Sequence, residues 1–214
     1  MISRLRLGLA LILASACGPQ ATAAHGATEL APPAEMGPHC EMHKTEPSAL
    51  VRSEAAYAVP ALTLIRQDGS AYPLAALAEA DRVVVLNFIF ATCTTICPVM
   101  TATFAQARAA LGADAARIQM VSITIDPQHD TPAVLAAYAA TFDAPADWAF
   151  LTGSEDDVNT VLHAFSADFG SKFNHRPLTL IHPPGGANWI RLEGQGGGAE
   201  LAAAIRPHLA PHQP

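Results

Sequence analysis

The chain has 214 residues, of which 50% are hydrophobic and 14% are charged, and its formal net charge is −7. This length and composition predict one globular domain with additional segments, and they exclude a disordered chain. The acidic balance and the lack of any run of Lys and Arg argue against nucleic acid as a partner.

The N-terminus has the pattern of an export signal. Basic residues precede a short apolar segment, residues 7–16, which is too short for a standard membrane span. Two processing routes stay open. Cleavage at the Ala-x-Ala site of residues 21–23 removes an export signal of residues 1–23, whereas lipoprotein processing lipidates Cys17. Either route predicts an exported, periplasmic protein that touches the membrane only through its N-terminus.

Residues 24–54 are rich in Ala, Pro, Glu and His without an apolar period, which predicts a flexible linker. This linker contains four soft or borderline metal donors within five residues, here named the linker cluster: His39, Cys40, Met42 and His43. Two interpretations stay open for the linker cluster. It is either an auxiliary copper site or a set of tail residues that bind metal adventitiously.

The folded domain is predicted from residue 55 to residue 214, with strands and helices assigned from apolar periodicity and turn residues. The expected order begins with two strands around Asp68-Gly69, a strand at 82–90 and a helix from Pro98 to Gly112. A strand at 117–125, a helix opened by Thr131 and Pro132, and a strand at 148–151 follow. The last elements are a helix after Glu155, a hairpin over Gly185-Gly186 and a helix at 200–209. Strands that alternate with helices indicate a mostly parallel sheet, to which the hairpin adds an antiparallel edge.

Two cysteines directly after a buried strand are the most informative feature. Cys93 and Cys97 are followed by Pro98, which suits the first turn of a helix. Thiolates are the nucleophiles of disulfide exchange and are also soft ligands for Cu(I). We expect Cys97 to lie near the helix N-terminus, where the helix dipole favours its thiolate. A plain structural or redox disulfide is the alternative.

The strings FATCTTICP, TIDPQHDTP and WAFLTG, with the downstream pair Asn174-His175, together resemble the Sco/SenC family of copper chaperones. The resemblance covers residues 55–210. It implies an α/β, thioredoxin-like (peroxiredoxin-like) fold, in which helices flank a central sheet and an N-terminal hairpin is added. It also implies that Cys93, Cys97 and His175 hold one copper ion, as Cu(I) or Cu(II).

The segment around His175 departs from the family pattern. Asn174 stands where the family usually has Asp, and Arg176 stands where it has Ser, with no Tyr following. The missing carboxylate matters because such an acceptor usually orients a ligating imidazole. A weaker or differently tuned site is the expected result. His182 is the other candidate ligand in this segment, and its alternative interpretation is a strand-end residue.

The loop with Asp126, His129 and Asp130 has the residue types of a second metal site. We prefer a structural interpretation, in which Asp130 caps the helix that begins near Pro132 and Asp126 shapes a turn. The family resemblance places this loop near the copper site, so Asp126 is also a candidate for a supporting contact there.

Three functions are weighed. The first, which the family resemblance implies, is an exported copper metallochaperone that supplies the CuA centre of cytochrome c oxidase or a similar acceptor. The second is a thiol-disulfide oxidoreductase that reduces acceptor cysteines before metal insertion, with Cys93 and Cys97 as its redox-active pair. The third, a peroxiredoxin-type peroxidase, has Thr92 beside Cys93 but no convincing Arg partner. His175 favours the first, because a dithiol reductant needs no distant imidazole.

Overall fold

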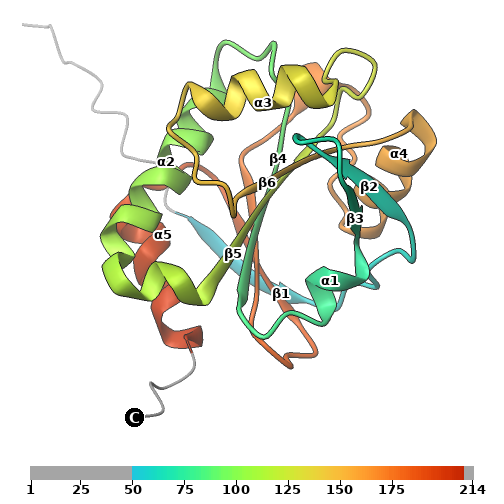
Figure 1. The fold of residues 1–214 in the computed structure, drawn as a ribbon. Coiled ribbons are helices and arrows are strands. Elements are labelled where there is room, and N and C mark those ends of the chain that lie inside the picture. The colour runs from blue at the N-terminus through green and yellow to red at the C-terminus, as the bar shows by residue number, and fades with distance from the viewer. Residues whose placement is uncertain (1–49, 210–214) are drawn as a thin grey trace, which may run out of the picture. The chain divides into compact units, whose positions relative to one another are not determined.

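The computed structural model describes residues 50–209. Their centre is an eight-stranded sheet with the order β1-β8-β7-β4-β5-β6-β2-β3 (Figure 1). The strands are β1 (Val51–Ala55), β2 (Thr63–Arg66), β3 (Ala71–Pro73), β4 (Val83–Ile89), β5 (Ile118–Thr124), β6 (Ala149–Thr152), β7 (Leu178–His182) and β8 (Trp189–Glu193). The helices are α1 (Ala75–Ala78), α2 (Ile96–Leu111), α3 (Pro132–Ala140), α4 (Glu155–Ala164) and α5 (Gly198–Ile205), with short 3-10 helices η1 (Gly112–Arg117), η2 (Lys172–Asn174) and η3 (Arg206–His208).

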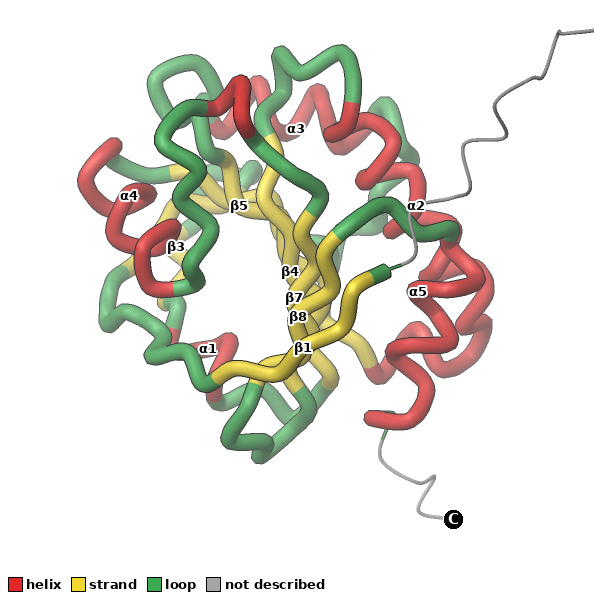
Figure 2. The backbone as a smooth tube through the Cα atoms, turned by 180° about the vertical axis from the view of Figure 1, so that it is seen from behind, coloured by secondary structure: helices red, strands yellow, loops and turns green. Residues whose placement is uncertain are grey.

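Helices cover both faces of the sheet, and a hydrophobic cluster lies beneath each layer. Residues of α2, α3 and α5 pack on one face around Phe104 and Trp148. Residues of α1 and α4 pack on the other face around Phe88 and Phe165. The two opposed views agree that α2 and α5 lie together on one side and α1 and α4 on the other (Figure 1 and Figure 2). All residues of β4 are buried, as predicted for a strand covered on both faces.

The strand pairing differs from the mostly parallel sheet that the sequence indicated. Among the described strands, only β4–β5 and β5–β6 are parallel pairs. The remaining five pairs are antiparallel. A parallel pair needs a crossover connection, and α2 and α3 supply the two crossovers here. The β7–β8 hairpin lies inside the sheet and not at its edge, because β1 covers β8.

The first strand begins before the predicted start of the domain. β1 pairs with β8 from Val51↔Glu193 to Ala55↔Trp189. Residues 51–54, which we assigned to the linker, therefore belong to the sheet. The predicted export signal with Cys17 and the linker cluster lie outside the described residues. Within residues 50–209, no helix is long and apolar enough to cross a membrane.

The ends of α2 and the start of α3 follow the sequence signals. Pro98 lies in the first turn of α2, and Gly112, with φ 58°, ends that helix. Thr131 caps α3 by accepting a hydrogen bond from the Val134 N–H at 3.3 Å. The prediction that Asp130 caps this helix is wrong. Its carboxylate faces the opposite direction, into the polar network described below.

The topology brings four chain segments together along one edge of the sheet, the edge that is formed by the ends of the strands. β4, β5 and β6 are parallel, so their carboxyl ends share this edge. β7 is antiparallel to β4, so its amino end lies at the same edge. The loop after β4 carries both cysteines, the loop after β5 carries Asp126 and Asp130, and the segment before β7 carries His175.

Candidate metal and thiol site

Cys97 and His175, which are 78 residues apart in sequence, meet at this edge of the sheet. The Cys97 Sγ lies 3.8 Å from the His175 Nδ1. Both residues are buried: Cys97 is 0% exposed and His175 is 8% exposed. The structure thus brings the predicted third donor beside one of the two thiols.

Cys93 occupies the start of α2 as a helix cap. Its Sγ accepts a hydrogen bond from the Cys97 N–H at 3.5 Å. The Thr95 side chain stands at the N-cap position but makes no capping hydrogen bond, and its Oγ1 lies 3.6 Å from the Cys93 Sγ. The sulfur therefore satisfies a helix donor that would otherwise lack a partner.

The two thiols have opposite electrostatic environments. Burial raises the pKa of Cys97, and the nearby Cys93 and Asp130 raise it further. Burial also acts to raise the pKa of Cys93, but hydrogen bonds from Cys97 and Thr95 outweigh it and lower that pKa below its ordinary value. Cys97 lies in the first turn of α2, as predicted, but its raised pKa contradicts the prediction that the helix start favours its thiolate, and Cys93 receives this stabilisation instead.

His175 presents a neutral imidazole to the site. Burial lowers its pKa to about 4, so the ring carries no charge at neutral pH. Its Nε2 is buried without a hydrogen-bond partner in the described structure. Phe90 and Phe169 pack around the ring, with centroid distances of 6.4 Å and 6.0 Å. A neutral, apolar-walled imidazole has its lone pair available for a soft metal ion.

A pocket of about 340 Å³ opens onto the site. Cys93 and His175 line it, whereas Cys97 lies behind it. Lys172 and the exposed Phe173 form part of its rim. In the part of the chain that the structure describes, no three His, Cys, Asp or Glu side chains form a ready-made metal-binding group. The donors are therefore neighbours and not a closed coordination shell.

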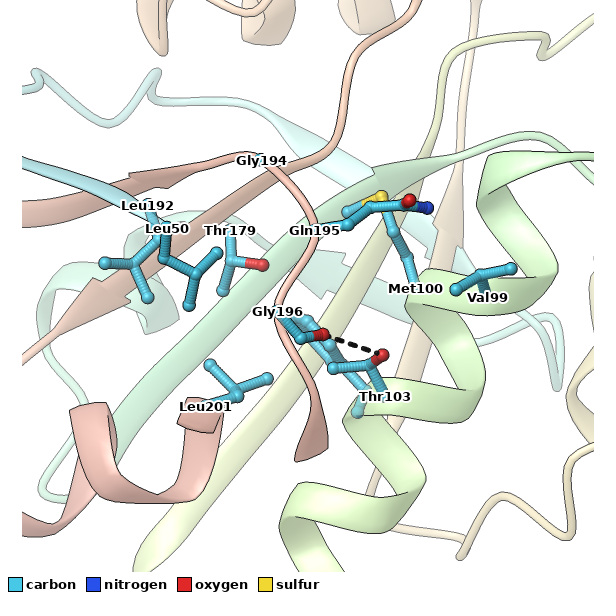
Figure 3. A pocket seen from close by; sticks show the side chains of 11 residues that line it. Leu50, Val99, Met100, Thr103, Thr179, Leu192, Gly194, Gln195, Gly196 and Leu201 are labelled. Atoms are coloured by element: carbon cyan, nitrogen blue, oxygen red, sulfur yellow. Dashed lines mark hydrogen bonds between the residues drawn. The ribbon is translucent and has the colours of Figure 1, made fainter. Parts of the chain in front are cut away.

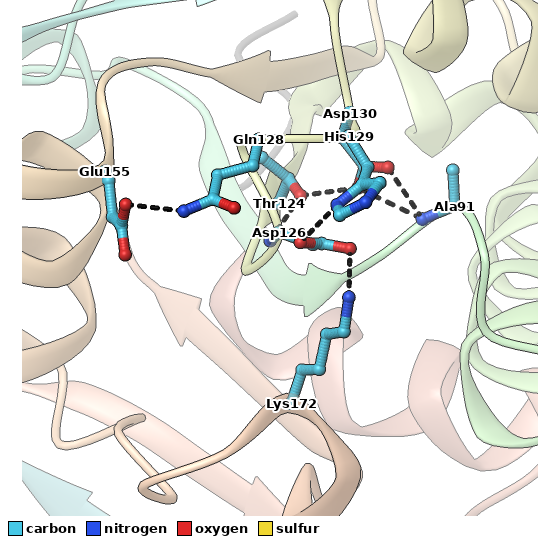
Figure 4. A network of polar contacts seen from close by, with 8 residues as sticks. All are labelled: Ala91, Thr124, Asp126, Gln128, His129, Asp130, Glu155 and Lys172. Carbon is cyan, nitrogen blue, oxygen red and sulfur yellow. Dashed lines mark hydrogen bonds and ion pairs between the residues drawn. The ribbon is translucent and has the colours of Figure 1, made fainter.

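A polar network links the loop after β5 to the loop that carries the cysteines (Figure 4). Asp130 is 0% exposed and accepts hydrogen bonds from the Ala91 N–H at 3.0 Å and the Thr124 hydroxyl at 2.5 Å. Burial raises the pKa of Asp130, while these two donors oppose that effect. The carboxylate thus fixes the chain two residues before Cys93.

Asp126 continues this network toward His175. Its Oδ2 accepts from the Lys172 Nζ at 2.6 Å, and its Oδ1 lies 3.0 Å from the His129 Nδ1. Burial acts to raise the pKa of Asp126, but Lys172 and His129 lower it below its ordinary value. Asp126 contacts Lys172 and His129 and not the imidazole, so its supporting contact at the copper site stays a prediction. Sequence reasoning did not single out Lys172, because no local periodicity joins it to a carboxylate 46 residues away.

The other candidates lie elsewhere or belong to the scaffold. His182 is at the end of β7, where its Nε2 lies 2.8 Å from the Gly186 carbonyl and its ring stacks on Trp189. This contact supports the strand-end interpretation of His182. A second pocket lies between α2, α5 and the segment after β8 (Figure 3). At about 20 Å³ it holds about one water molecule, and Met100 is its one soft donor.

Comparison with known proteins, by family model and by individual relative, leads to one family. The SCO1/SenC family model matches residues 52–184. The SCO1 protein homolog of Bacillus subtilis (strain 168) is 35% identical over 114 residues, which are 52% of this chain and 58% of that protein. The match therefore spans less than two thirds of this relative.

Solved structures share the fold. Bradyrhizobium japonicum ScoI with copper bound aligns with a TM-score of 0.57 and 20% identity, over 72% of this chain and 100% of that one. BsSco, a member of the Sco family of cytochrome c oxidase assembly proteins, aligns with a TM-score of 0.62 and 24% identity, over 74% and 97% of the two chains. The predicted thioredoxin-like α/β fold is confirmed. Because the family model covers more than half of the sequence, the chain belongs to the SCO1/SenC family.

Proposed function

We propose that this protein is an exported copper-binding assembly factor that holds one copper ion with Cys93, Cys97 and His175. The observation that carries the proposal is the 3.8 Å approach of the His175 Nδ1 to the Cys97 Sγ. Two thiolates suit Cu(I), and a neutral imidazole adds the borderline donor that Cu(II) accepts. Relatives of this fold have been solved with copper bound, among them ScoI of Bradyrhizobium japonicum and yeast Sco1.

The acceptor that we propose is a cytochrome c oxidase subunit with a CuA centre, or a site of similar chemistry. BsSco is described as a cytochrome c oxidase assembly protein, and a Bacillus anthracis member of the family is a lipoprotein. These relatives support an exported protein, periplasmic or tethered at its N-terminus. Residues 1–23 are the proposed export signal, and a lipid on Cys17 or an uncleaved signal would supply the tether.

A second function, reduction of acceptor cysteines, is favoured by the contrast between the two thiols. Cys93 lines the pocket with a lowered pKa, whereas Cys97 is fully buried. In the exchange, the Cys93 thiolate attacks an acceptor disulfide and releases one acceptor thiolate. Cys97, after losing its proton, attacks the mixed disulfide, so that the acceptor leaves as a dithiol and Cys93–Cys97 becomes a disulfide.

The test is anaerobic copper titration of the reduced full chain in which the linker cluster is changed to alanine. A competing Cu(I) chelator reports affinity, and optical spectra after Cu(II) addition report thiolate coordination. We expect one copper per chain. His175→Ala should abolish the intense thiolate-to-Cu(II) band, and Cys93→Ser or Cys97→Ser should abolish tight Cu(I) binding.

His163→Ala is the matched control, because the His163 side chain is 69% exposed and lies outside the site. It should leave both signals unchanged. Unaltered copper stoichiometry in all three site variants would refute the assignment. Weak copper binding together with ready oxidation of the cysteine pair would favour the reductase.

A further inference from the structure

We propose that Lys172 is a positioning residue for the metal site. Its ion pair with Asp126 holds the turn that carries His175 against the loop after β5, and the contacts of Asp130 join that loop to the one that carries the cysteines. This inference rests on the proposed copper site, and it assigns a role to a side chain that is not itself a donor.

The first step is that no hydrogen bond to its Nε2 fixes the imidazole. The His175 Nε2 has no partner among the described residues, so Asn174 does not supply the acceptor that usually orients a ligating histidine. Ring packing against Phe90 and Phe169 limits the tilt of the imidazole. Apart from the 3.8 Å contact of its Nδ1 with the Cys97 Sγ, the position of the ring then depends on the position of its backbone.

The second step is that this backbone lies in a short surface turn. η2 has three residues and its internal hydrogen bonds are local, from the Asn174 N–H to the Ser171 carbonyl at 2.9 Å and from the His175 N–H to the Lys172 carbonyl at 3.3 Å. The Phe173 side chain is 84% exposed and adds no packing of this turn into the core. The Lys172 Nζ lies 5.8 Å from the ring centroids of both Phe90 and Phe173 and reaches the buried Asp126 carboxylate at 2.6 Å.

The third step is that the partner of Lys172 is itself immobilised. Asp126 is 7% exposed, and its N–H donates to the Thr124 hydroxyl oxygen at 2.9 Å. That hydroxyl donates to Asp130, which in turn binds the Ala91 N–H. Figure 4 shows this continuous set of contacts from Lys172 to Ala91. The turn that carries His175 and the loop that carries the cysteines are thus joined by polar contacts as well as by the sheet.

The direction of the effect follows from the chemistry of the pair. Removing the ammonium leaves a buried carboxylate with less compensation, which breaks the contact between the turn and the loop after β5. The thiols keep their own contacts, because Cys93 is held by the start of α2. Loss of Lys172 should therefore weaken the contribution of His175 selectively.

The first measurement uses the metal-free full chain. Hydrogen–deuterium exchange of the amides of residues 172–175 should be about fivefold faster in Lys172→Met than in the wild type. Lys172→Arg, which keeps a cation within reach of Asp126, should restore the wild-type rate. Arg176→Met is the matched control, since it removes a cation from the same segment whose guanidinium lies over the Phe169 ring and not on Asp126.

The second measurement is copper affinity with the linker cluster changed to alanine. Lys172→Met should weaken Cu(II) binding about tenfold and should have no further effect when His175 is already Ala. An equal loss in the His175→Ala background, or an equal loss in Arg176→Met, would overturn the proposal in favour of a general charge effect. Unchanged amide exchange in Lys172→Met would also overturn it. If the wild type binds no copper while exchange responds as stated, the proposed function fails and the positional role of Lys172 stands.

Discussion

At the scale of single residues, the two cysteines differ in their position and in their contacts. Cys93 caps α2 and borders the pocket, whereas Cys97 is buried in the first turn of α2, beside the His175 imidazole. The sequence motif predicts a thiol pair after a strand, and this is what the structure contains. It does not predict which thiol is activated, because hydrogen bonds and burial at each sulfur depend on the loop path and not on the spacing.

This contrast predicts different alkylation rates in the reduced, metal-free protein. Each unit of pKa changes the thiolate population about tenfold, so Cys97 should react with iodoacetamide at least about tenfold more slowly than Cys93. The Cys93 rate should rise with pH to a midpoint below 9.0, its ordinary pKa. Mass spectrometry of quenched samples measures both rates. In urea the difference should disappear, and equal rates in the folded protein would contradict the assignment.

The same scale shows where sequence reasoning reaches its limit. The family resemblance identified His175 as a candidate. Lys172 and the inward role of Asp130 were not identified, because both depend on contacts between segments that are remote in sequence. A helix-capping interpretation of Asp130 was reasonable locally, and it failed because the adjacent Thr131 caps the helix instead.

At the scale of elements, the boundaries of the strands and helices were largely predictable, whereas their pairing was not. Apolar periodicity located β4, β5 and α2 closely. It could not show that β1 adds to β8, since Val51–Ala55 is exposed along most of its length and has no apolar alternation. The preponderance of antiparallel pairs follows from hairpins that attach at both sides of the β4–β5–β6 core.

The packing of α5 on α2 gives a prediction at this scale. A Cβ on Gly198 would lie 2.3 Å from the Gln106 Cβ and 2.9 Å from the Ala107 nitrogen. Gly198→Ser should therefore force the helices apart and lower the free energy of unfolding by about 1–3 kcal/mol. Gly197→Ser is the matched control, because nothing lies within 4 Å of its Cβ position and serine suits a helix N-cap. Urea unfolding compares the two, and equal midpoints would refute the close-packing argument.

At the scale of the whole molecule, copper should stabilise the folded state only through the third proposed donor, His175. An unfolded chain keeps Cys93 and Cys97 close in sequence and so retains a thiolate pair, whereas His175 is distant. Binding to the unfolded state reduces any stabilisation by the ligand. In the proposed site, the affinity that His175 contributes is therefore the part that should stabilise the fold.

Thermal unfolding tests this in the chain that lacks the linker cluster. A hundredfold preference of copper for the folded state corresponds to about 2.7 kcal/mol, which for a domain of this size raises Tm by about 5–10 °C. Removal of the metal with a chelator should reverse the shift. His175→Ala should abolish most of it, and a shift of undiminished size in that variant would contradict the argument.

The separation of 78 residues between Cys97 and His175 also sets the order in which the site can come into being. The imidazole reaches the thiols only after β7 has paired with β4, and such long-range pairing is slow to form. A chain that is still unfolded presents a dithiol without a histidine. At that stage the two thiols react as any pair of cysteines that are close in sequence: they can be oxidised, and they can bind other thiophilic metals. The proposed three-donor site can therefore form only when the sheet is complete, and a preference for copper should appear at that stage of folding.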